Sequence, residues 1–503
     1  MSTTKESSGL VLASSLFLVS AAWAWRDARK AARYRSRFQG AQHRGIAPAR
    51  STRAQGEVSS RGQLALSPSI PYLDQFVACL QDPCDVQSNP QGFIALCVAE
   101  NKLILDMLAE RFMQVGTATS SFSDSSVYCY NSFLGMPIAR EAVAYFLARR
   151  FLFPDRPNLP PDEALQHIRP NNVGIGSGAA AMLNQLFFLL GEAGEGCLIP
   201  APYYAAFEND MNLVAGVVPF GIPQENPILG PSDDEMEAAF LQAKAKGISP
   251  KFLLLTNPNN PLATIYQPSA VARMISWARN RNMHTIVDEI YALSMHKKQG
   301  HGFQSVLQIL DNDLGSDVHM VWAVSKDFGG SGLRVGVVYS QNEIFMEGLA
   351  TSNIFSGVSG PMQYLMCEIL TDDAFVDRFL EESRTRVIQS YRICTAKLEE
   401  MVLPFVPAEA GLFVYVDFSS LLPEKTFEWE RKLGELMFEY AHLVLTPGAS
   451  QRETRPGMFR ICYAWVHPSI LEVAMERLSR LVAKVRRMDW SDLQSRSLSS
   501  VLE

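Results

Sequence analysis

The most constraining feature of this sequence is a series of short, continuous apolar runs that alternate with helical patterns. The run "NNVGIG" at Asn171 precedes the helix-like "AAAMLNQLFFLLGEAG", and "KFLLLT" at Lys251 precedes a helix-like stretch that begins at Ser269. Further strand-like runs are "GCLIP" at Gly196, "HTIVDEIY" at His284 and "VHMVWAVSK" at Val318. Strands without a polar face, separated by helices, predict a mostly parallel sheet that is covered by helices on both sides.

The chain has 503 residues, which is long for a single domain and favours a body with two lobes. After about Ser356 a long helical pattern is followed by the short strands "GLFVYVDF" and "MFRICYAW" and by a final helix near Pro468 to Arg487, which predicts a second, smaller lobe. The predicted organisation is a hydrophobic segment at 1–30, a basic flexible linker at 31–67, the N-terminal part of a small domain at 68–115, a large domain at 116–355, the rest of the small domain at 356–490 and a tail at 491–503.

The N-terminus carries an uncharged run of 17 residues from Gly9 to Trp25. Nine Arg or Lys follow between Arg26 and Arg53, against the single acid Asp27. By the positive-inside rule, this pattern predicts a membrane anchor with the catalytic body facing the cytosol. A cleaved secretory signal, a mitochondrial presequence and a disordered leader are the alternatives.

The overall composition excludes some classes of function. The formal net charge of −7 argues against a nucleic-acid binder, which usually presents a basic face. The eight cysteines form no C-x-x-C pair and are too sparse to crosslink a body of this size, so they are interpreted as free thiols in a reducing compartment. No metal site is predicted.

Polar residues that can take part in catalysis or ligand binding lie where the predicted strands end. Asn260 lies in "NPNNP", Asp288 and Tyr291 in "VDEIY", Lys326 in "SKDF" and Arg334 in "LRVG". Each alone has an ordinary explanation as a turn, a helix cap or a solvated charge. Because parallel sheets bind ligands at the carboxyl ends of their strands, the set as a whole indicates one site at that edge.

The chemistry that suits this set is that of pyridoxal phosphate. A partly desolvated lysine, Lys326, can form a Schiff base with the cofactor aldehyde. A buried carboxylate, Asp288, can keep the ring nitrogen protonated so that the ring acts as an electron sink. Asn260 and Tyr291 can hydrogen-bond the ring hydroxyl. The helix start after "GIGSG", together with Arg334, can bind the phosphate.

On these residues the sequence resembles the fold-type-I, pyridoxal-phosphate-dependent class I/II aminotransferases, and within them the 1-aminocyclopropane-1-carboxylate (ACC) synthase branch. The matching motifs run from about Asn89 to Val482 and are "VAENKL" (Val98–Leu103), "GMPIAREAVA" (Gly135–Ala144), "PAPYYAAFENDM" (Pro200–Met211), "NPNNPLAT" (Asn257–Thr264), "VDEIYAL" (Val287–Leu293), "SKDFGGSGLRVG" (from Ser325) and "PGMFRICYA" (Pro456–Ala464). The resemblance implies an aspartate aminotransferase-like fold. In it a large α/β domain with a mostly parallel seven-stranded sheet is joined to a smaller α+β domain, here preceded by the N-terminal hydrophobic helix. It also implies a homodimer whose active sites take residues from both chains.

The resemblance also assigns roles to individual residues. Lys326 resembles the Schiff-base lysine that moves the Cα proton, Asp288 the pyridinium partner, and Asn260 and Tyr291 the ligands of the ring oxygen. Ser177, Gly178 and Ala179 match the phosphate turn, with Ser325 and Arg334 nearby. Tyr204 matches the stacking aromatic, or Tyr203 if the alignment slips by one residue. Arg460 matches the arginine that binds the substrate carboxylate, and Glu100 matches the glutamate of the ACC-synthase "AEN" signature.

Three features, at four positions, depart from the family pattern. Ala323 stands where a serine commonly contacts the phosphate, and Ala179 and Ala180 replace Thr-Gly in the phosphate turn. Phe133 stands where ACC synthases have a tyrosine that reaches the neighbouring subunit's cofactor, and Tyr130 lies close in sequence. These changes weaken the case for the ACC-synthase reaction without weakening the case for cofactor binding.

The shared machinery serves several reactions that start from removal of the Cα proton and formation of a quinonoid. Transamination of an α-amino acid is the leading prediction. ACC formation and carbon–sulfur or carbon–nitrogen lyase activity are the alternatives within the family, and a catalytically inactive, membrane-anchored binding protein is the alternative of another class. No second arginine is clearly placed for a dicarboxylic substrate.

Overall fold

The computed structural model describes residues 65, 70, 72–114, 121–297, 302–488 and 490. The predicted anchor at 1–30, nearly all of the linker at 31–67 and the tail at 491–503 lie outside these residues. No helix among the described residues is long and apolar enough to span a bilayer. All eight cysteines are described, and each is a free thiol, as predicted.

A seven-stranded sheet forms the centre of the large domain, in the order β2-β8-β7-β6-β5-β3-β4. Its strands are β2 (Val173–Gly176), β3 (Glu195–Pro200), β4 (Val218–Ile222), β5 (Ser249–Thr256), β6 (His284–Asp288), β7 (Val318–Ala323) and β8 (Gly336–Ser340). β8 pairs antiparallel with both β2 and β7, whereas the neighbours from β7 to β4 pair in parallel. The predicted mostly parallel, seven-stranded sheet is therefore confirmed.

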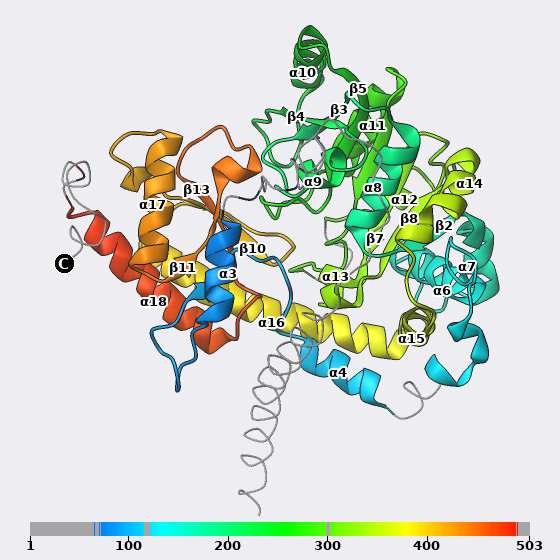
Figure 1. Ribbon diagram of the computed structural model, residues 1–503, viewed down its shortest axis with the longest axis horizontal. Helices are drawn as coiled ribbons and strands as arrows, with labels where there is room; N and C mark the ends of the chain where they lie inside the picture. The colour runs from blue at the N-terminus through cyan, green and yellow to red at the C-terminus, as the bar shows by residue number, and fades with distance from the viewer. Residues whose placement is uncertain are drawn as a thin grey trace, which may run out of the picture. The chain divides into compact units, whose positions relative to one another are not determined.

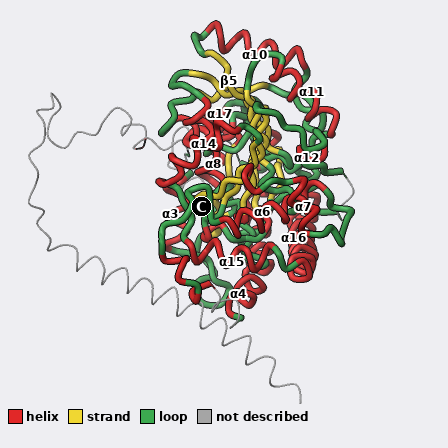
Figure 2. Tube along the Cα trace, turned by 90° about the vertical axis from the view of Figure 1, so that its right-hand side faces the viewer, coloured by secondary structure: helices red, strands yellow, loops and turns green. Residues whose placement is uncertain are grey.

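Helices cover both faces of this sheet, as Figures 1 and 2 show. Alternate residues of β5 supply the two cores: Phe252 and Leu254 pack with α8 on one face, and Leu253 and Leu255 pack on the other. The helices of the large domain are α6 (Pro137–Leu147), α7 (Pro161–His167), α8 (Ala179–Leu190), α9 (Phe207–Asn212), α10 (Asp233–Ala245), α11 (Pro268–Arg279), α12 (Val306–Ile309), α13 (Val324–Asp327) and α14 (Glu343–Ser352). Because β5 is buried on both faces, its apolar run is continuous rather than alternating.

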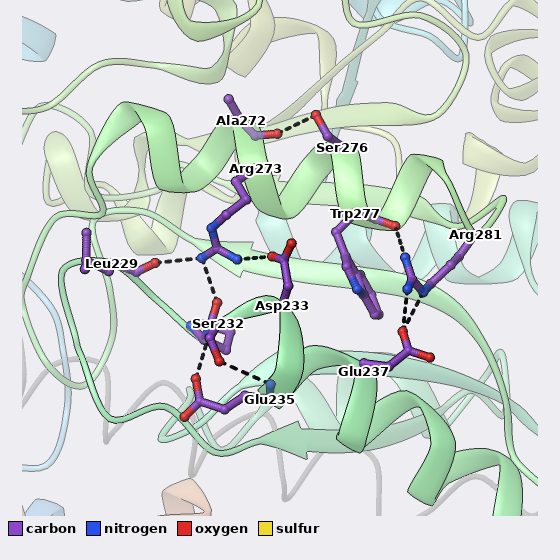
Figure 3. Close-up of polar contacts among 11 residues, drawn as sticks. Leu229, Ser232, Asp233, Glu235, Glu237, Ala272, Arg273, Ser276, Trp277 and Arg281 are labelled. Carbon is purple, nitrogen blue, oxygen red and sulfur yellow. Dashed lines mark hydrogen bonds and ion pairs between the residues drawn. The ribbon is translucent and has the colours of Figure 1, made fainter.

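Two ion pairs hold α10 against α11 on one face of the sheet (Figure 3). Arg273 lies 2.5 Å from Asp233, and Arg281 pairs with Glu237. The guanidinium of Arg281 also lies 4.1 Å from the ring centre of Trp277. Each partly exposed pair adds little stability alone, so these contacts chiefly fix the orientation of α10.

The small domain is built from both ends of the described chain. Its sheet has the order β12-β13-β10-β9, and every neighbouring pair is antiparallel. The elements are β9 (Phe405–Val406), β10 (Phe413–Asp417), β12 (Thr446–Pro447) and β13 (Met458–Cys462), with α16 (Asp373–Glu400), α17 (Phe427–Glu439) and α18 (Pro468–Val485). The N-terminal part supplies α3 (Leu73–Gln81) and β1 (Ile94–Ala95), and β1 pairs in parallel with β11 (Leu443–Val444). Two helices between these parts, α4 (Leu105–Met113) and α15 (Gly360–Leu370), pack instead with the core of the large domain. The helix α3 contacts β1 and β11, and the 28-residue helix α16 packs against α18 and extends toward α15 at its other end (Figure 1). The exact domain boundaries stay a prediction.

Two neighbouring histidines form a hydrogen-bonded chain within the large sheet. His284 Nδ1 lies 3.2 Å from His319 Nε2, and His319 Nδ1 lies 2.8 Å from Ser340 Oγ. Burial lowers the pKa of His319 to about 3, and burial together with the charge of Lys251 lowers the pKa of His284 to about 4. Both rings are therefore neutral in the folded protein at physiological pH.

We expect this pair to make the fold sensitive to mild acid. Below pH 6.5 the unfolded chain gains protons that the buried rings do not, so stability falls as the pH drops from 6.5 toward 4. For His319 the loss between pH 7.5 and pH 5.0 amounts to about 2 kcal/mol. Urea unfolding midpoints at the two pH values measure it. His319→Asn should reduce the dependence on pH, whereas the exposed control His467→Asn should not; equal slopes in all three proteins would contradict this account.

Candidate active site

The predicted site residues meet at one edge of the large sheet because of its topology. Thr256 and Asp288 are the last residues of the parallel strands β5 and β6, and Lys326 lies in α13 directly after β7. Arg334 is the exception to the prediction of successive strand ends, because it precedes β8. Since β8 runs antiparallel to β7, the start of β8 lies beside the end of β7, which brings Arg334 to the same edge.

A cavity of about 240 Å³ opens at this edge. Among the predicted residues, its wall contains Glu100, Ala179, Tyr204, Asn260, Asp288, Tyr291, Ser325, Lys326 and Arg334. Four others lie outside the wall: Ser177, Gly178, Tyr203 and Arg460. The structure thus brings most of the predicted set around one volume.

Lys326 presents its amine to the cavity from α13. Its Nζ donates a hydrogen bond of 2.7 Å to the carbonyl oxygen of Ala99. Burial lowers the pKa of this amine, and the carboxylate of Glu100 is the largest influence in the opposite direction. A desolvated amine of this kind loses its proton more readily, which is what a nucleophilic lysine requires.

Asp288 is a buried carboxylate, with 4% of its surface exposed. One of its oxygens accepts a 3.2 Å hydrogen bond from the backbone N–H of Ile290. Burial, with a smaller contribution from the nearby Asp210, raises its pKa to about 7, and the Ile290 N–H and Lys326 act in the opposite direction. In the part of the chain that the structure describes, no cationic side chain forms a salt bridge with Asp288. A protonated ring nitrogen in the cavity would supply the missing positive charge.

Asn260, Tyr291 and Arg460 form a buried polar chain on the side of the small domain. Asn260 Nδ2 lies 3.4 Å from the Tyr291 hydroxyl, and Asn260 Oδ1 accepts a 2.8 Å bond from Arg460 Nη1. Arg460 Nη2 donates to the carbonyl oxygen of Cys97 and to Thr446, whereas its buried Nε has no partner among the described residues. The guanidinium thus keeps one donor for an anion.

The turn between β2 and α8 is suited to a phosphate. Gly178, the N-cap of α8, has φ of +89° and offers no side chain to the first amides of the helix. A Cβ on Gly178 would lie 2.6 Å from Arg334 Nη2, which itself donates a 3.0 Å bond to the Ser177 carbonyl oxygen. The open helix start and the adjacent guanidinium make an anion site. Lys326, Asp288 and this turn together therefore fit pyridoxal phosphate.

The structure distinguishes the two adjacent tyrosines. Tyr204 lies in the cavity wall, as the unshifted alignment predicts. Tyr203 points elsewhere, since its hydroxyl lies 3.2 Å from Glu208 Oε1. Tyr204 is therefore the aromatic ring available to cover a bound cofactor.

Two residues near the site were not predicted. Asp210, in α9, lies in the cavity wall, and burial raises its pKa to about 7. Tyr72, which precedes α3, lies beside Arg460 and hydrogen-bonds the side chain of Thr446. The sequence around Asp210 is that of an ordinary acidic residue in a helix. Tyr72 comes near the site through the pairing of β1 with β11. Neither position could therefore be recognised from the local sequence.

The departures from the family pattern lie around the phosphate turn. Ala323 is fully buried and precedes α13, and Ala179 and Ala180 add no hydroxyl to the cavity wall. Tyr130 and Phe133 are not part of the wall; the Tyr130 side chain is 94% exposed, and its ring packs edge-on against Phe133. Backbone amides and Arg334 are thus the main donors at this turn.

We expect Asp288→Asn to stabilise the cofactor-free protein at alkaline pH. The unfolded chain ionises this carboxyl near pH 3.9, whereas the folded chain keeps the proton up to about pH 7, so the wild type loses stability as the pH rises from 4 to 7. The variant should melt about 1–3 °C above the wild type at pH 8, and the difference should shrink at pH 5. Thermal melts of the two cofactor-free proteins measure it. A variant that is less stable at pH 8 would contradict the idea of an uncompensated charge.

Comparison with known proteins gives the same family as the geometry. The family model for aminotransferase class I and II matches residues 95–478. The chain is 31% identical to 1-aminocyclopropane-1-carboxylate synthase 2 of Arabidopsis thaliana over 82% of this chain and 83% of that protein. It is 32% identical to a Mus musculus protein named "probable inactive 1-aminocyclopropane-1-carboxylate synthase-like protein 2", over 79% and 67% respectively. Its fold is similar to a double mutant of aspartate aminotransferase from Thermus thermophilus, with a TM-score of 0.68, 19% identity, and coverage of 85% of this chain and 100% of the other.

The family match spans most of the chain, and the relatives resemble it over more than two thirds of their own length. Enzymes of this family use pyridoxal phosphate, and the residues around the cavity fit that cofactor. The chain belongs to the class I and II aminotransferase family, in its ACC-synthase-like branch.

Proposed function

We propose that this protein is an aminotransferase that acts on a small α-amino acid. The observation that carries the proposal is the convergence of a desolvated lysine, a buried carboxylate without a cation and a helix-start anion site on one cavity. The cavity has a volume of about 240 Å³, which the cofactor and the substrate would share.

Arg460 binds the α-carboxylate of the substrate in this proposal. Its guanidinium is held by Asn260, Cys97 and Thr446, and its buried Nε has no partner among the described residues; Arg460 lies behind Asn260, which is part of the cavity wall. A guanidinium held by three partners orients a planar carboxylate better than a lysine would. The substrate's Cα is thereby held near Lys326.

Lys326 is the base that moves the proton. Its lowered pKa leaves the amine free to take the proton from the substrate Cα and to return it to another carbon during transamination. When bound, pyridoxal phosphate supplies the electron sink that makes the Cα proton acidic. Asp288 holds a positive charge at the ring nitrogen, Tyr204 covers the ring and Arg334 holds the phosphate.

ACC synthesis is the second candidate because of Glu100 and the relatives. Glu100 lies in the cavity wall, where it is the carboxylate with the largest effect on Lys326. Several relatives at about 30% identity bear the name 1-aminocyclopropane-1-carboxylate synthase. A lyase of the same family would use the same residues to expel a β-substituent.

A substrate panel separates the three reactions. We expect the purified protein to exchange amino groups between a small amino acid and 2-oxoglutarate, detected as a new keto acid. Incubation with S-adenosylmethionine should give no cyclopropane product, and cysteine conjugates should give no pyruvate or ammonia. Formation of ACC as the main product would overturn the proposal in favour of the second candidate.

Lys326→Ala serves as the control for this panel and tests the inactive alternative. The wild type should absorb between about 400 and 430 nm because Lys326 is joined to the cofactor. The variant should lose this absorbance and the exchange of amino groups. A wild type that binds the cofactor and catalyses none of the three reactions would instead support a binding protein.

A homodimer is the form in which we propose the enzyme works. Exposed aromatic side chains flank the phosphate turn: Tyr128, Tyr130 and Phe355 are 66%, 94% and 92% exposed. They belong to segments joined to the turn, since Ser177 N–H donates 2.7 Å to the Ser356 carbonyl oxygen. Large apolar side chains gathered at one place on a surface indicate a contact with another protein chain, and a second copy of this chain would complete the turn.

We expect the paired change Tyr130→Asp and Phe355→Asp to shift the protein from dimer to monomer. Charges at the centre of a contact between two copies are costly because the dimer must bury them. Sedimentation equilibrium measures the shift. Leu241→Asp, at a residue of α10 with 55% exposure, should leave the dimer intact; a monomeric wild type would contradict the proposal.

A further inference from the structure

Ser331 contacts Glu100 across the active-site cavity. The Ser331 hydroxyl donates a hydrogen bond to Glu100 Oε1 although the two residues lie 231 positions apart. Both side chains line the cavity together with Lys326. Within the described residues, no other side chain donates a hydrogen bond to the Glu100 carboxylate, so this contact determines where that carboxylate points.

The orientation of Glu100 matters because of what surrounds the Lys326 amine. Four ionisable groups act on Lys326, in decreasing order Glu100, Arg460, Cys462 and Asp288. Glu100 favours the protonated amine and opposes the effect of burial. Glu100 also acts on the pKa of Lys102, whose amine lies 3.1 Å from the ring centre of Trp465. A Glu100 side chain released from Ser331 could therefore turn toward Lys102 and away from Lys326.

The backbone of Ser331 is held in place by the phosphate turn. Ser331 begins a short 3-10 helix, and its carbonyl oxygen accepts a 2.9 Å bond from Arg334 Nη1. The same guanidinium donates through Nη2 to the Ser177 carbonyl oxygen. The hydroxyl that holds Glu100 thus stands on the scaffold that forms the anion site.

We propose that Ser331 is a positioning residue that fixes the Glu100 carboxylate in the cavity it shares with Lys326 and so sets the readiness of the Lys326 amine to react. Ser331 acts only through Glu100 and touches neither the reacting carbon nor the proton. The inference rests on the proposed function, because it concerns the amine that joins the cofactor. It assigns to one side chain of the glycine-rich turn, Ser331, an influence on the reactivity of the Lys326 amine.

The experiment uses the full-length cofactor-free protein and pyridoxal phosphate as the probe. The Lys326 amine condenses with the cofactor aldehyde and water leaves, and absorbance between about 400 and 430 nm follows the reaction. Only the unprotonated amine attacks, so the rate measured from pH 6 to pH 10 gives the apparent pKa of Lys326. The proteins compared are the wild type, Glu100→Gln, Ser331→Ala, Ser331→Thr and the double variant.

Glu100→Gln should lower the apparent pKa of Lys326 by about one unit, because the amine loses an opposite charge. Ser331→Ala should produce at least about half of that shift in the same direction, and the double variant should shift no further than Glu100→Gln alone. Ser331→Thr, which keeps the hydroxyl, should stay near the wild type. Should Ser331→Ala fail to fold, Ser331→Cys, a weaker donor of similar size, should show the same downward shift.

An unshifted Ser331→Ala beside a shifted Glu100→Gln would overturn the inference and leave the proposed function intact. An unshifted Glu100→Gln would overturn it as well, since Glu100 would then not act on Lys326. Additive shifts in the double variant would show that Ser331 acts independently of Glu100. A wild type without the absorbance at any pH would overturn the proposed function itself.

Discussion

A carboxylate buried without a cation is the constraint on which the rest of this structure depends. Asp288 ends a strand whose last four residues are buried, and its carboxylate accepts a single backbone hydrogen bond. Burying an unpaired charge is expensive, and the rise of its pKa to about 7 is the physical sign of that cost. A cationic ligand bound beside Asp288 would compensate the negative charge of this carboxylate. The protein accepts a less stable cofactor-free state in order to hold one charged ring firmly.

The sheet topology explains how the other groups come to face the same volume. Parallel strands β5, β6 and β7 end at one edge and deliver Thr256, Asp288 and Lys326 there. The antiparallel strand β8 begins at that edge, so Arg334 arrives from the opposite chain direction. The N-terminal segment contributes Glu100 to the wall, and the small domain contributes Arg460 from β13, which lies behind the wall and hydrogen-bonds Asn260. Three separate parts of the chain therefore meet only in the folded protein.

Much of this could be predicted from the sequence because the signals are local. The sequence runs that form β5, β6 and β7 are largely apolar on both faces. The polar residues that follow each run therefore stand out in the sequence. The edge strand β4 gave a weaker signal, since four of its five residues are only partly buried. Arg334 was predicted to lie at the site because it was expected to follow a strand, whereas it precedes β8. Sequence spacing alone does not reveal that β8 runs antiparallel to β7. Asp210, Tyr72 and the contact between Ser331 and Glu100 depend on tertiary packing and have no local pattern. The N-terminal apolar segment lies outside the described residues, so the anchor stays a prediction.

The central claim is that Asp288 keeps the ring nitrogen of the cofactor positively charged. Nitrogen NMR of the protein loaded with pyridoxal phosphate that carries ¹⁵N in the ring observes this directly. The account predicts a protonated ring nitrogen in the wild type up to at least about pH 8, and a neutral one when Asp288 is replaced by asparagine. A neutral ring nitrogen in the wild-type complex at pH 7 would contradict it.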